Sequence, residues 1–472
     1  MTPVLALLTL LTLTDVPLRP DALLAGATAT STDPALTLEQ VLSSAHRAFP
    51  PLTAASADID GADADALAAA GAFDPLWRTR AAGVPAGDYP QLRLDSTVEA
   101  PTPLWGSTFF GGYRLGVGKF QPYYGERETW SGGELRAGVL VPVLRNGPTD
   151  RRRTSLARAE ISRSLARLSR DQQRLEVTRL ATARYWDWVA AGQRRQVVRA
   201  LLDLAKARDT QLAVRTGVGD APQFDRQDNA RAIAQREAAL VQAQRGVEQA
   251  AFELSLFLRD ERGEPVLPAD GALPSFPAPP VEPRFEFADV LARRPDVTRL
   301  LEQKRSAQLE VELQKNQLWP ALDVGVAVSG DLGRPGAFGS TRPVELELTA
   351  GLEVPLLYRA PLGRLRSAEA AVSKLDAQLQ FARERARVDV DDGLSALRRA
   401  LERTESTRRE VDAAALVEQG ERRRFELGEG TLLFVNLREQ ATAEARLREI
   451  DARLDALKAL ATLGAALALD SP

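Results

Sequence analysis

The sequence predicts a mostly α-helical chain with a smaller β component, built from two tandem copies of one unit. Three observations lead to this fold class. Short motifs recur in the same order at separations above 200 positions. Two long stretches lack proline and place apolar residues every three or four positions, which is typical of helices. Between them lie short segments in which apolar and polar residues alternate, as in strands.

The repeat is marked by four landmarks. Two proline motifs recur after 245 positions, a Val-Pro motif after 213 and a glycine pair after 211. Such a repeat must be recognised before a fold is assigned. The pairs are Phe49-Pro50-Pro51-Leu52 with Arg294-Pro295-Asp296-Val297, Phe73-Asp74-Pro75 with Leu318-Trp319-Pro320, Val141-Pro142-Val143-Leu144 with Val354-Pro355-Leu356-Leu357, and Gly217-Val218-Gly219 with Gly428-Glu429-Gly430.

These landmarks divide the chain into four parts. Residues 1–29 form a predicted signal peptide, since Val4–Leu13 is an apolar run too short to span a bilayer. The first repeat covers 36–259 and the second 285–469. Between them, 260–284 holds seven prolines and is predicted to be an extended linker.

Composition argues against several classes of function. The net charge is -3, so bulk charge gives no reason to expect a nucleic-acid partner. The chain has no cysteine, and its only histidine is His46. Thiol chemistry is therefore excluded, and histidine-based metal sites and acid–base catalysis are nearly so. We expect no cofactor and no enzymatic activity.

The helices are predicted to be few and long. A short helix covers Leu36–Phe49, with Thr37 as N-cap and Gln40 three residues later, and another follows to Ala70. Thr149–Thr216 is expected to form one helix roughly 100 Å long, at about 1.5 Å per residue. Gln223–Leu258 then runs back. In the second copy Gly363–Leu427 goes out and Leu432–Leu469 returns.

The strands have one apolar and one polar face. The clearest segments are Glu134–Val143, Leu322–Val328 and Val344–Leu356. In the last of these, Glu345, Glu347 and Glu353 alternate with Val344, Leu346, Leu348 and Leu352. The first copy has 32 additional positions in its strand region, counted between Pro75 and Pro142 against Pro320 and Pro355. This insertion is rich in aromatic residues, which suits either a membrane-interface belt or ordered outer loop, or a plain surface loop.

Two strands per copy give four per chain, which cannot close a barrel. An open sheet edge is not tolerated in a bilayer, so closure requires several chains. Three chains would give a shared 12-stranded β-barrel, an even count within the range of outer-membrane barrels. Glu345, Glu347 and Glu353 would then line its water-filled lumen.

This layout resembles the TolC-type outer-membrane efflux and secretion channel family. The resemblance covers about Leu36 to Leu469 and depends on the order of its motifs, repeated twice. These motifs are Leu36-Thr37-Leu38-Glu39-Gln40, Arg293-Arg294-Pro295-Asp296-Val297, Leu318-Trp319-Pro320-Ala321-Leu322, the two Val-Pro strand ends, and Arg424-Phe425-Glu426-Leu427-Gly428-Glu429-Gly430-Thr431.

The resemblance implies a homotrimeric outer-membrane factor: a shared β-barrel in outer-membrane lipid above a long α-helical coiled-coil barrel in the periplasm. A periplasmic adaptor (membrane fusion) protein and an inner-membrane transporter of RND or ABC type would dock at the helical tips. The residues implied at these tips are Gly217, Gly219, Asp220, Gly428, Glu429, Gly430 and Thr431.

The residues just beyond the tips are implied to lie near the periplasmic entrance. Asp225 and Asp228 share a helix face and could form a ring of six carboxylates in a trimer, or be solvated carboxylates near a helix N-terminus. The matching stretch of the second copy, Leu433–Leu437, has no acidic residue. Phe434 there could form an apolar constriction or pack in a helix seam.

Two other classes of protein share some of these features. A periplasmic coiled-coil scaffold without a pore would share the hairpins but not the strands with one apolar face. An adaptor protein would have one helical hairpin flanked by β-domains, not two hairpins in tandem.

Overall fold

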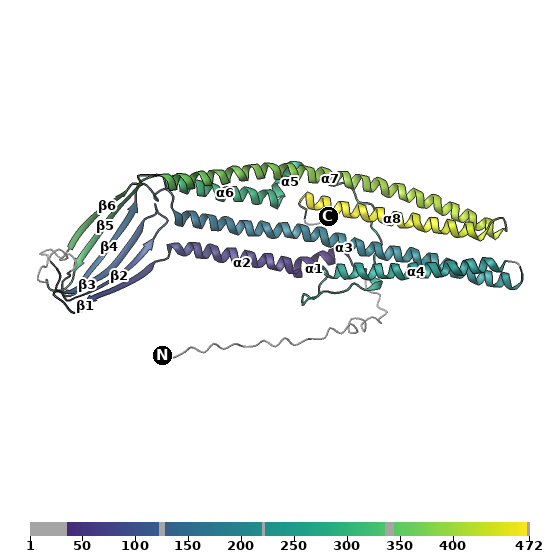
Figure 1. Cartoon of the computed structure of the whole chain (residues 1–472), viewed down its shortest axis with the longest axis horizontal. Coiled ribbons are helices and arrows are strands. Elements are labelled where there is room, and N and C mark those ends of the chain that lie inside the picture. The colour runs from purple at the N-terminus through teal and green to yellow at the C-terminus, as the bar shows by residue number, and fades with distance from the viewer. Residues whose placement is uncertain (1–34, 122–127, 220–221, 336–343, 470–472) are drawn as a thin grey trace, which may run out of the picture.

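The computed structural model describes residues 35–121, 128–219, 222–335 and 344–469, which form one elongated body (Figure 1). A six-stranded sheet occupies one end, and helices run from it to two hairpin tips at the other end. The mostly helical fold class with a β component is confirmed. The predicted signal peptide and Asp220 lie outside the described residues.

The helices are arranged as four parallel columns. Two are continuous, α3 and α7, with 67 and 68 residues. The other two are broken, with α4 following α2 and α8 following α6 end to end (Figure 1). The bounds are α1 (Leu38–Ala48), α2 (Pro50–Ala70), α3 (Arg151–Gly217), α4 (Gln223–Ser255), α5 (Phe287–Arg293), α6 (Pro295–Asn316), α7 (Arg359–Glu426) and α8 (Leu432–Ala466).

Packing sets the order of these columns. The column of α2 and α4 contacts α3, α3 contacts both α6 and α8, and these contact α7. Each copy of the repeat therefore supplies one continuous and one broken column. The outermost columns, α2 with α4 on one side and α7 on the other, have no further helical column beside them in the described chain.

The helix boundaries follow local chemistry. Thr37 caps α1 in the predicted capping box, because its hydroxyl accepts from the Gln40 amide and the Gln40 side chain accepts from the Thr37 amide. Prolines open α2 and α6, where the missing amide proton costs nothing. α3 has no proline and α7 has only Pro361, in its first turn, so neither helix is interrupted.

Arg294 and Asp296, which flank Pro295 in the proline motif of the second copy, tie the start of α6 to α7. The Arg294 guanidinium contacts the carboxylates of Asp296 at 2.7 Å and of Asp389 at 3.2 Å. Burial works to raise the pKa of Asp296, but the hydrogen bonds with Arg294, the positive charge of Arg294 and hydrogen bonds from backbone amides together hold that pKa below its usual value.

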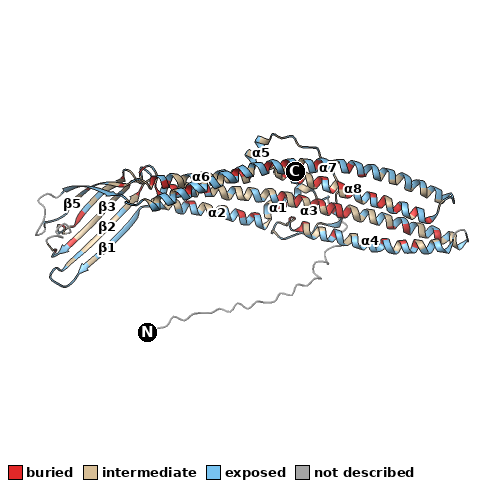
Figure 2. Cartoon of the chain, turned by 45° about the horizontal axis from the view of Figure 1, so that its top comes forward, coloured by how far each residue is buried: buried red, intermediate tan, exposed pale blue. Residues whose placement is uncertain are grey.

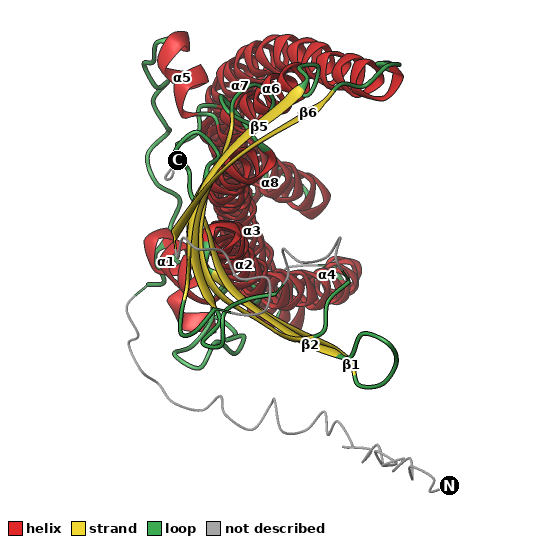
Figure 3. Ribbon diagram, turned by 90° about the vertical axis from the view of Figure 1, so that its left-hand side faces the viewer, coloured by secondary structure: helices red, strands yellow, loops and turns green. Residues whose placement is uncertain are grey.

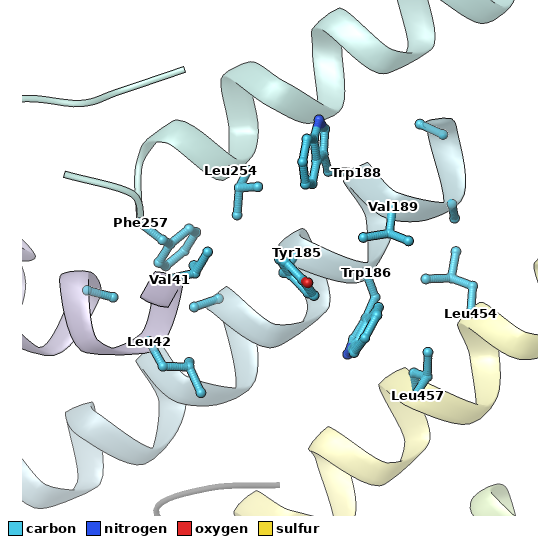
Figure 4. Packing of buried hydrophobic residues seen from close by; sticks show 14 of the residues in the cluster. Val41, Leu42, Tyr185, Trp186, Trp188, Val189, Leu254, Phe257, Leu454 and Leu457 are labelled. Carbon is cyan, nitrogen blue, oxygen red and sulfur yellow. The ribbon is translucent and has the colours of Figure 1, made fainter. Parts of the chain in front are cut away.

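The main core lies at mid-height, where α1, α3, α4 and α8 meet (Figure 4). Its centre is an aromatic cluster on α3: Tyr185 and Trp186 are 4.7 Å apart in an edge-to-face arrangement, and Trp188 is buried beside them. Burial raises the pKa of Tyr185 to about 12. Part of the predicted linker packs here too, since Ala272 is buried and its carbonyl accepts from the Leu36 amide.

The sheet is antiparallel throughout, and its strands follow one another in chain order. Every strand pairs with the next one along the sequence, so each direct strand-to-strand connection is a hairpin except that α3 to α6 separate β4 from β5. The strands are β1 (Leu76–Val84), β2 (Gln91–Pro101), β3 (Thr108–Gly118), β4 (Glu134–Pro142), β5 (Ala321–Asp331) and β6 (Val344–Glu353).

The predicted number of four strands per chain was wrong, because the described chain has six. The 32 additional positions are not a connection: they supply two more strands, so that the first copy contributes β1 to β4. Glycines at 111, 112, 116 and 118 hid β3, because glycine-rich segments usually indicate loops. Phe109, Phe110 and Tyr113 of the insertion lie in β3, and Tyr123 and Tyr124 lie outside the described residues.

Hydropathy and helix length give no candidate membrane-spanning helix among the residues described.

Candidate channel walls and helical tips

The six strands share one apolar face that nothing in the described chain covers (Figure 2). Strand register decides which side chains share a face, since successive residues point to opposite sides. Leu346 and Leu348 on β6 are 67% and 71% exposed, as befits a face without a covering layer. Its large apolar members are Trp77, Leu92, Leu94, Val98, Phe109, Tyr113, Leu115, Val117, Leu135, Val139, Val141, Leu322, Val324, Val326, Val328, Val344, Leu346, Leu348 and Leu352.

This apolar face carries almost no polar side chains. Thr79 and Ser96 are exceptions, and they satisfy each other through a 2.9 Å hydrogen bond, while Trp77 donates to Ser96 at 2.7 Å. An uncovered apolar surface that crosses six strands is far larger than soluble monomers usually expose. It matches the lipid-facing side of a membrane barrel.

The opposite face is polar and hollow. A single depression is lined by side chains of all six strands, among them Arg78, Thr97, Phe110, Arg136 and Glu347. Strands at the two ends of the sheet can line one depression only if the sheet curves toward this face, and Figure 3 shows the curve. Charges on this face pair across neighbouring strands: Arg78 contacts Glu99 at 2.7 Å, and Arg114 forms an ion pair with Glu134.

The three glutamates predicted in the lumen all lie on this polar face. Glu347 lines the depression itself. Glu353 contacts Arg145 at 3.0 Å, at the junction between sheet and helices. Glu345 and Glu347 have no ion-pair partner within the described residues.

The two helical tips are built alike. Gly219 and Gly428 both have φ = +80°, the left-handed backbone region that glycine adopts without strain. At the second tip the Glu429 amide donates to the Arg424 carbonyl at 2.9 Å and the Gly428 amide to that of Phe425 at 3.1 Å. This pair of bonds is the Schellman motif, which satisfies carbonyls at the end of α7.

The remaining tip residues have different backbone roles. Gly217 is the last residue of α3, and Thr431 is the N-cap of α8. Gly430 lies close to the preceding turn, where an added Cβ would come within 3.0 Å of the Phe425 nitrogen. Large apolar side chains project from both tips, and several are more than half exposed: Val214, Val218, Phe224, Leu427, Leu433 and Leu437.

The three residues predicted at the entrance have different surroundings in the structure. Asp228 contacts Arg231 at 3.1 Å and accepts a hydrogen bond from Asn436 at 3.5 Å, whereas Asp225 has no ion-pair partner within the described residues. Phe434 is half exposed rather than buried in a helix seam.

Sequence reasoning missed the strongest polar cluster of the helical region. Glu439 of α8 is buried and meets three arginines, one from each of the other long helices. Arg208 of α3 forms an ion pair with it, Arg236 of α4 lies 3.3 Å away and Arg422 of α7 lies 3.1 Å away. We call these four residues the Glu439 cluster. Burial lowers the pKa of Arg236, and its two arginine neighbours add to that effect against Glu439.

A signal for this cluster was present in the sequence. Leu432, Val435 and Thr442 mark the buried stripe of α8, and Glu439 falls on the same stripe. A carboxylate at such a position is almost always paired. Which arginines pair with it could not be read, because they come from three other helices. No group of three or more acidic or histidine side chains is placed to hold a metal ion within the described residues.

Part of the chain resembles a known protein family in sequence. Residues 288–469 match the family model described as outer membrane efflux protein. A search of curated protein sequences finds no significant match.

Solved structures match over nearly the whole chain. The open state of the MtrE outer-membrane channel of Neisseria gonorrhoeae aligns at 17% identity and a TM-score of 0.65, covering 92% of this chain and 89% of that one. The outer membrane protein VceC of Vibrio cholerae aligns at 16% identity and 0.62, covering 91% and 96%. The CmeC outer-membrane channel of Campylobacter jejuni aligns at 13% identity and 0.61, covering 98% and 94%.

MtrE and CmeC are outer-membrane channels and VceC is an outer membrane protein, and the resemblance inferred from the sequence is confirmed. Residues 288–469 carry the sequence pattern of the outer membrane efflux protein family, and the chain as a whole has the fold of the outer-membrane channels.

Proposed function

We propose that this chain is one protomer of a trimeric outer-membrane channel, the exit duct of a tripartite efflux or type I secretion system. One observation carries the proposal: a sheet with an uncovered apolar face and a hollow polar face stands on helical columns of up to 68 residues. At about 1.5 Å per residue these columns reach roughly 100 Å, long enough to extend well beyond a bilayer. The sheet would lie in the outer membrane and the helices in the periplasm.

The surfaces of the chain take distinct roles in this proposal. The apolar face of the sheet contacts outer-membrane lipid, and Glu345, Glu347 and Glu353 face the lumen. The apolar side chains at the tips, around Gly219 and Gly428, receive a periplasmic adaptor protein. That adaptor connects the channel to an inner-membrane transporter of RND or ABC type. Substrate passes through without chemical change.

Residues near the tips form the periplasmic entrance. Asp225 supplies a carboxylate without an ion-pair partner among the described residues, and three copies would give a ring that attracts cations. Asp228 contributes less, because Arg231 already neutralises it. Phe434 near the start of α8 is half exposed and supplies an apolar surface.

The alternative is a periplasmic coiled-coil scaffold without a pore. It accounts for the hairpins but leaves the apolar face of six strands in water. At roughly 25 cal/mol per Å² such exposure is costly, so the channel is the better account.

The test is the native mass of the full-length protein after detergent extraction from separated outer membranes, followed by conductance in planar bilayers. A trimer that conducts ions supports the channel. A water-soluble monomer or dimer that needs no detergent would contradict it and favour the scaffold.

A further inference from the structure

The two edge strands of the sheet, β1 and β6, lack a partner on their outer sides. All ten residues of β6 are exposed, as is nearly all of β1. Unpaired backbone groups of this kind cannot remain within a bilayer, so each edge must be paired. Because the edges lie at opposite ends of the curved sheet (Figure 3), they do not meet within one chain.

The open edges of the sheet coincide with the open edges of the helical layer. β1 follows α2, which belongs to one outermost column, and β6 leads into α7, the other outermost column. A rotation that places β6 of one copy beside β1 of the next therefore also places α7 beside the neighbour's α2 and α4. Both outermost columns expose apolar side chains, including Phe381 and Leu416 on α7 and Val241 on α4.

Direction and charge make these edges complementary. β1 runs away from the helices and β6 runs toward them, so the two pair antiparallel, like every other pair in the sheet. A register that keeps the apolar face continuous puts Arg78 and Arg80 of one copy on the same side as Glu345 and Glu347 of its neighbour. Arg80 and both of these glutamates lack an ion-pair partner within the described chain, so neighbouring copies can supply it.

The additional hairpin of β2 and β3 is an integral part of the sheet. β2 pairs with β1 over Gln91–Glu99, and β3 pairs with β4 over Thr108–Arg114. The turn between β2 and β3 also packs closely against the segment that joins β4 to α3. A Cβ on Gly106 would come within 2.6 Å of the Asn146 carbonyl oxygen, and one on Gly147 within 2.6 Å of Trp105 Nε1.

We propose that β1 and β6 pair between copies and that three copies close an 18-stranded barrel, six strands from each chain. The inference depends on the trimeric channel proposed above and specifies its wall. Eighteen strands lie within the range of outer-membrane barrels, at the size that leaves an aqueous channel.

Geometry favours eighteen strands over twelve. Three chains bring together twelve helical columns, which at about 8–10 Å between axes span a circumference of roughly 100–120 Å. Eighteen strands spaced about 4.8 Å apart and tilted by about 40° span roughly 110 Å, whereas twelve span roughly 75 Å. The larger barrel continues the helical tube without narrowing.

Disulfide trapping tests the wall, because the natural chain has no cysteine. Thr79 of β1 lies on one hydrogen-bonded row with Ser96 of β2, Tyr113 of β3 and Leu135 of β4. Three kinds of double variant are made in the full-length protein and oxidised in the membrane. Thr79→Cys is combined with Ser96→Cys, with Leu135→Cys, or with a cysteine at one of the β6 positions Leu346, Leu348, Ala350 and Leu352.

The eighteen-stranded wall gives a distinct pattern. Thr79→Cys with Ser96→Cys closes within one chain, and at least one β6 partner gives covalent trimers on denaturing gels. Thr79→Cys with Leu135→Cys gives no bond, because three strand spacings, roughly 14 Å, exceed the reach of a disulfide. Thr79→Cys with Glu347→Cys or Thr349→Cys, on the opposite face of β6, is the matched control and gives no trimers.

Failure of this inference can be told apart from failure of the proposed function. A Thr79–Leu135 disulfide in a conducting trimer would show that the hairpin lies outside a twelve-stranded wall, and would overturn the inference while keeping the channel. A conducting trimer in which no β6 partner links to Thr79→Cys would also overturn it. A soluble protein that forms no trimer would overturn both.

Discussion

Glu439 is the residue on which the tip halves of the two hairpins depend most directly. Its carboxylate joins α3, α4, α7 and α8 through Arg208, Arg236 and Arg422. Buried ion pairs contribute little net stability when intact, because desolvation offsets attraction. Removing one partner is different, because the remaining charges stay buried without compensation. Here Arg208 and Arg236 would lose their only carboxylate partner among the described residues, whereas Arg422 would keep Glu418 at 2.5 Å.

We therefore expect Glu439→Gln to lower the free energy of unfolding by about 3–5 kcal/mol. The measurement is thermal unfolding of the detergent-extracted protein, followed by its helical circular dichroism. Glu444→Gln is the control, since this exposed residue on the same helix pairs with Arg448 only at 4.0 Å. It should change stability by less than about 0.5 kcal/mol. Equal effects of the two substitutions would refute a special role for Glu439.

At the scale of elements, the two hairpin tips depend on single glycines. Gly428 adopts φ = +80° because the chain must leave α7 and start α8 within a few residues. Open space surrounds it, so a substitution there acts through the backbone alone. Gly219 has the same φ and follows the C-cap residue of α3 as Gly428 follows that of α7. The folded tips therefore pair Gly428 with Gly219 and not with Gly217, which the sequence offset predicted.

Gly428→Ala should cost about 1–2 kcal/mol, the strain of a left-handed residue that has a Cβ. The tip conformation should change with it, so export through the assembled system should fall while trimers still form, because the tips lie far from the sheet. Native mass and efflux in cells measure the two effects. Gly420→Ala, at an open, exposed site inside α7, should instead stabilise by about 1 kcal/mol. Loss of trimers in Gly428→Ala would argue against the assignment of the tip.

At the scale of the whole molecule, the sheet must separate lipid from water. Leu348 and Thr349 are neighbours on β6 that face opposite sides of it. The same substitution at the two positions therefore tests which face meets lipid.

Leu348→Asp should impair insertion into the outer membrane, at a cost of at most about 2–4 kcal/mol near the bilayer midplane. Thr349→Asp should insert normally, because its carboxylate joins a polar surface. The amount of folded trimer in outer-membrane fractions measures both. A defect in Thr349→Asp alone would reverse the assignment of the two faces.

The sequence allowed the helical framework to be predicted almost completely. Two proline-free stretches, all of α3 and α7 after Pro361, and the capping pair Thr37 and Gln40 are local signals. They placed these helices to within a few residues. The faces of β4, β5 and β6 were equally readable from alternation. β3 was not, because glycine and aromatic residues obscured its period of two. β2 does alternate, with Leu92, Leu94 and Val98 on one face, but its pairing with β3 is a property of the folded sheet.

The tip and polar residues also differ in how far the sequence predicts them. The tip glycines could be named because a helical hairpin needs a turn. The partners of Asp228 and Glu439 could not be named, because they come from residues that are distant in the sequence.

The insertion of β2 and β3 as a complete hairpin has an evolutionary consequence. A hairpin adds one strand in each direction, so β1 and β4 keep their orientation and α2 and α3 keep their attachment whether it is present or absent. A single insertion in one gene is multiplied by the symmetry of the assembly. Related channels can therefore change the diameter of the barrel in discrete steps, while the helical tips at the opposite end keep the same surface for their partner proteins.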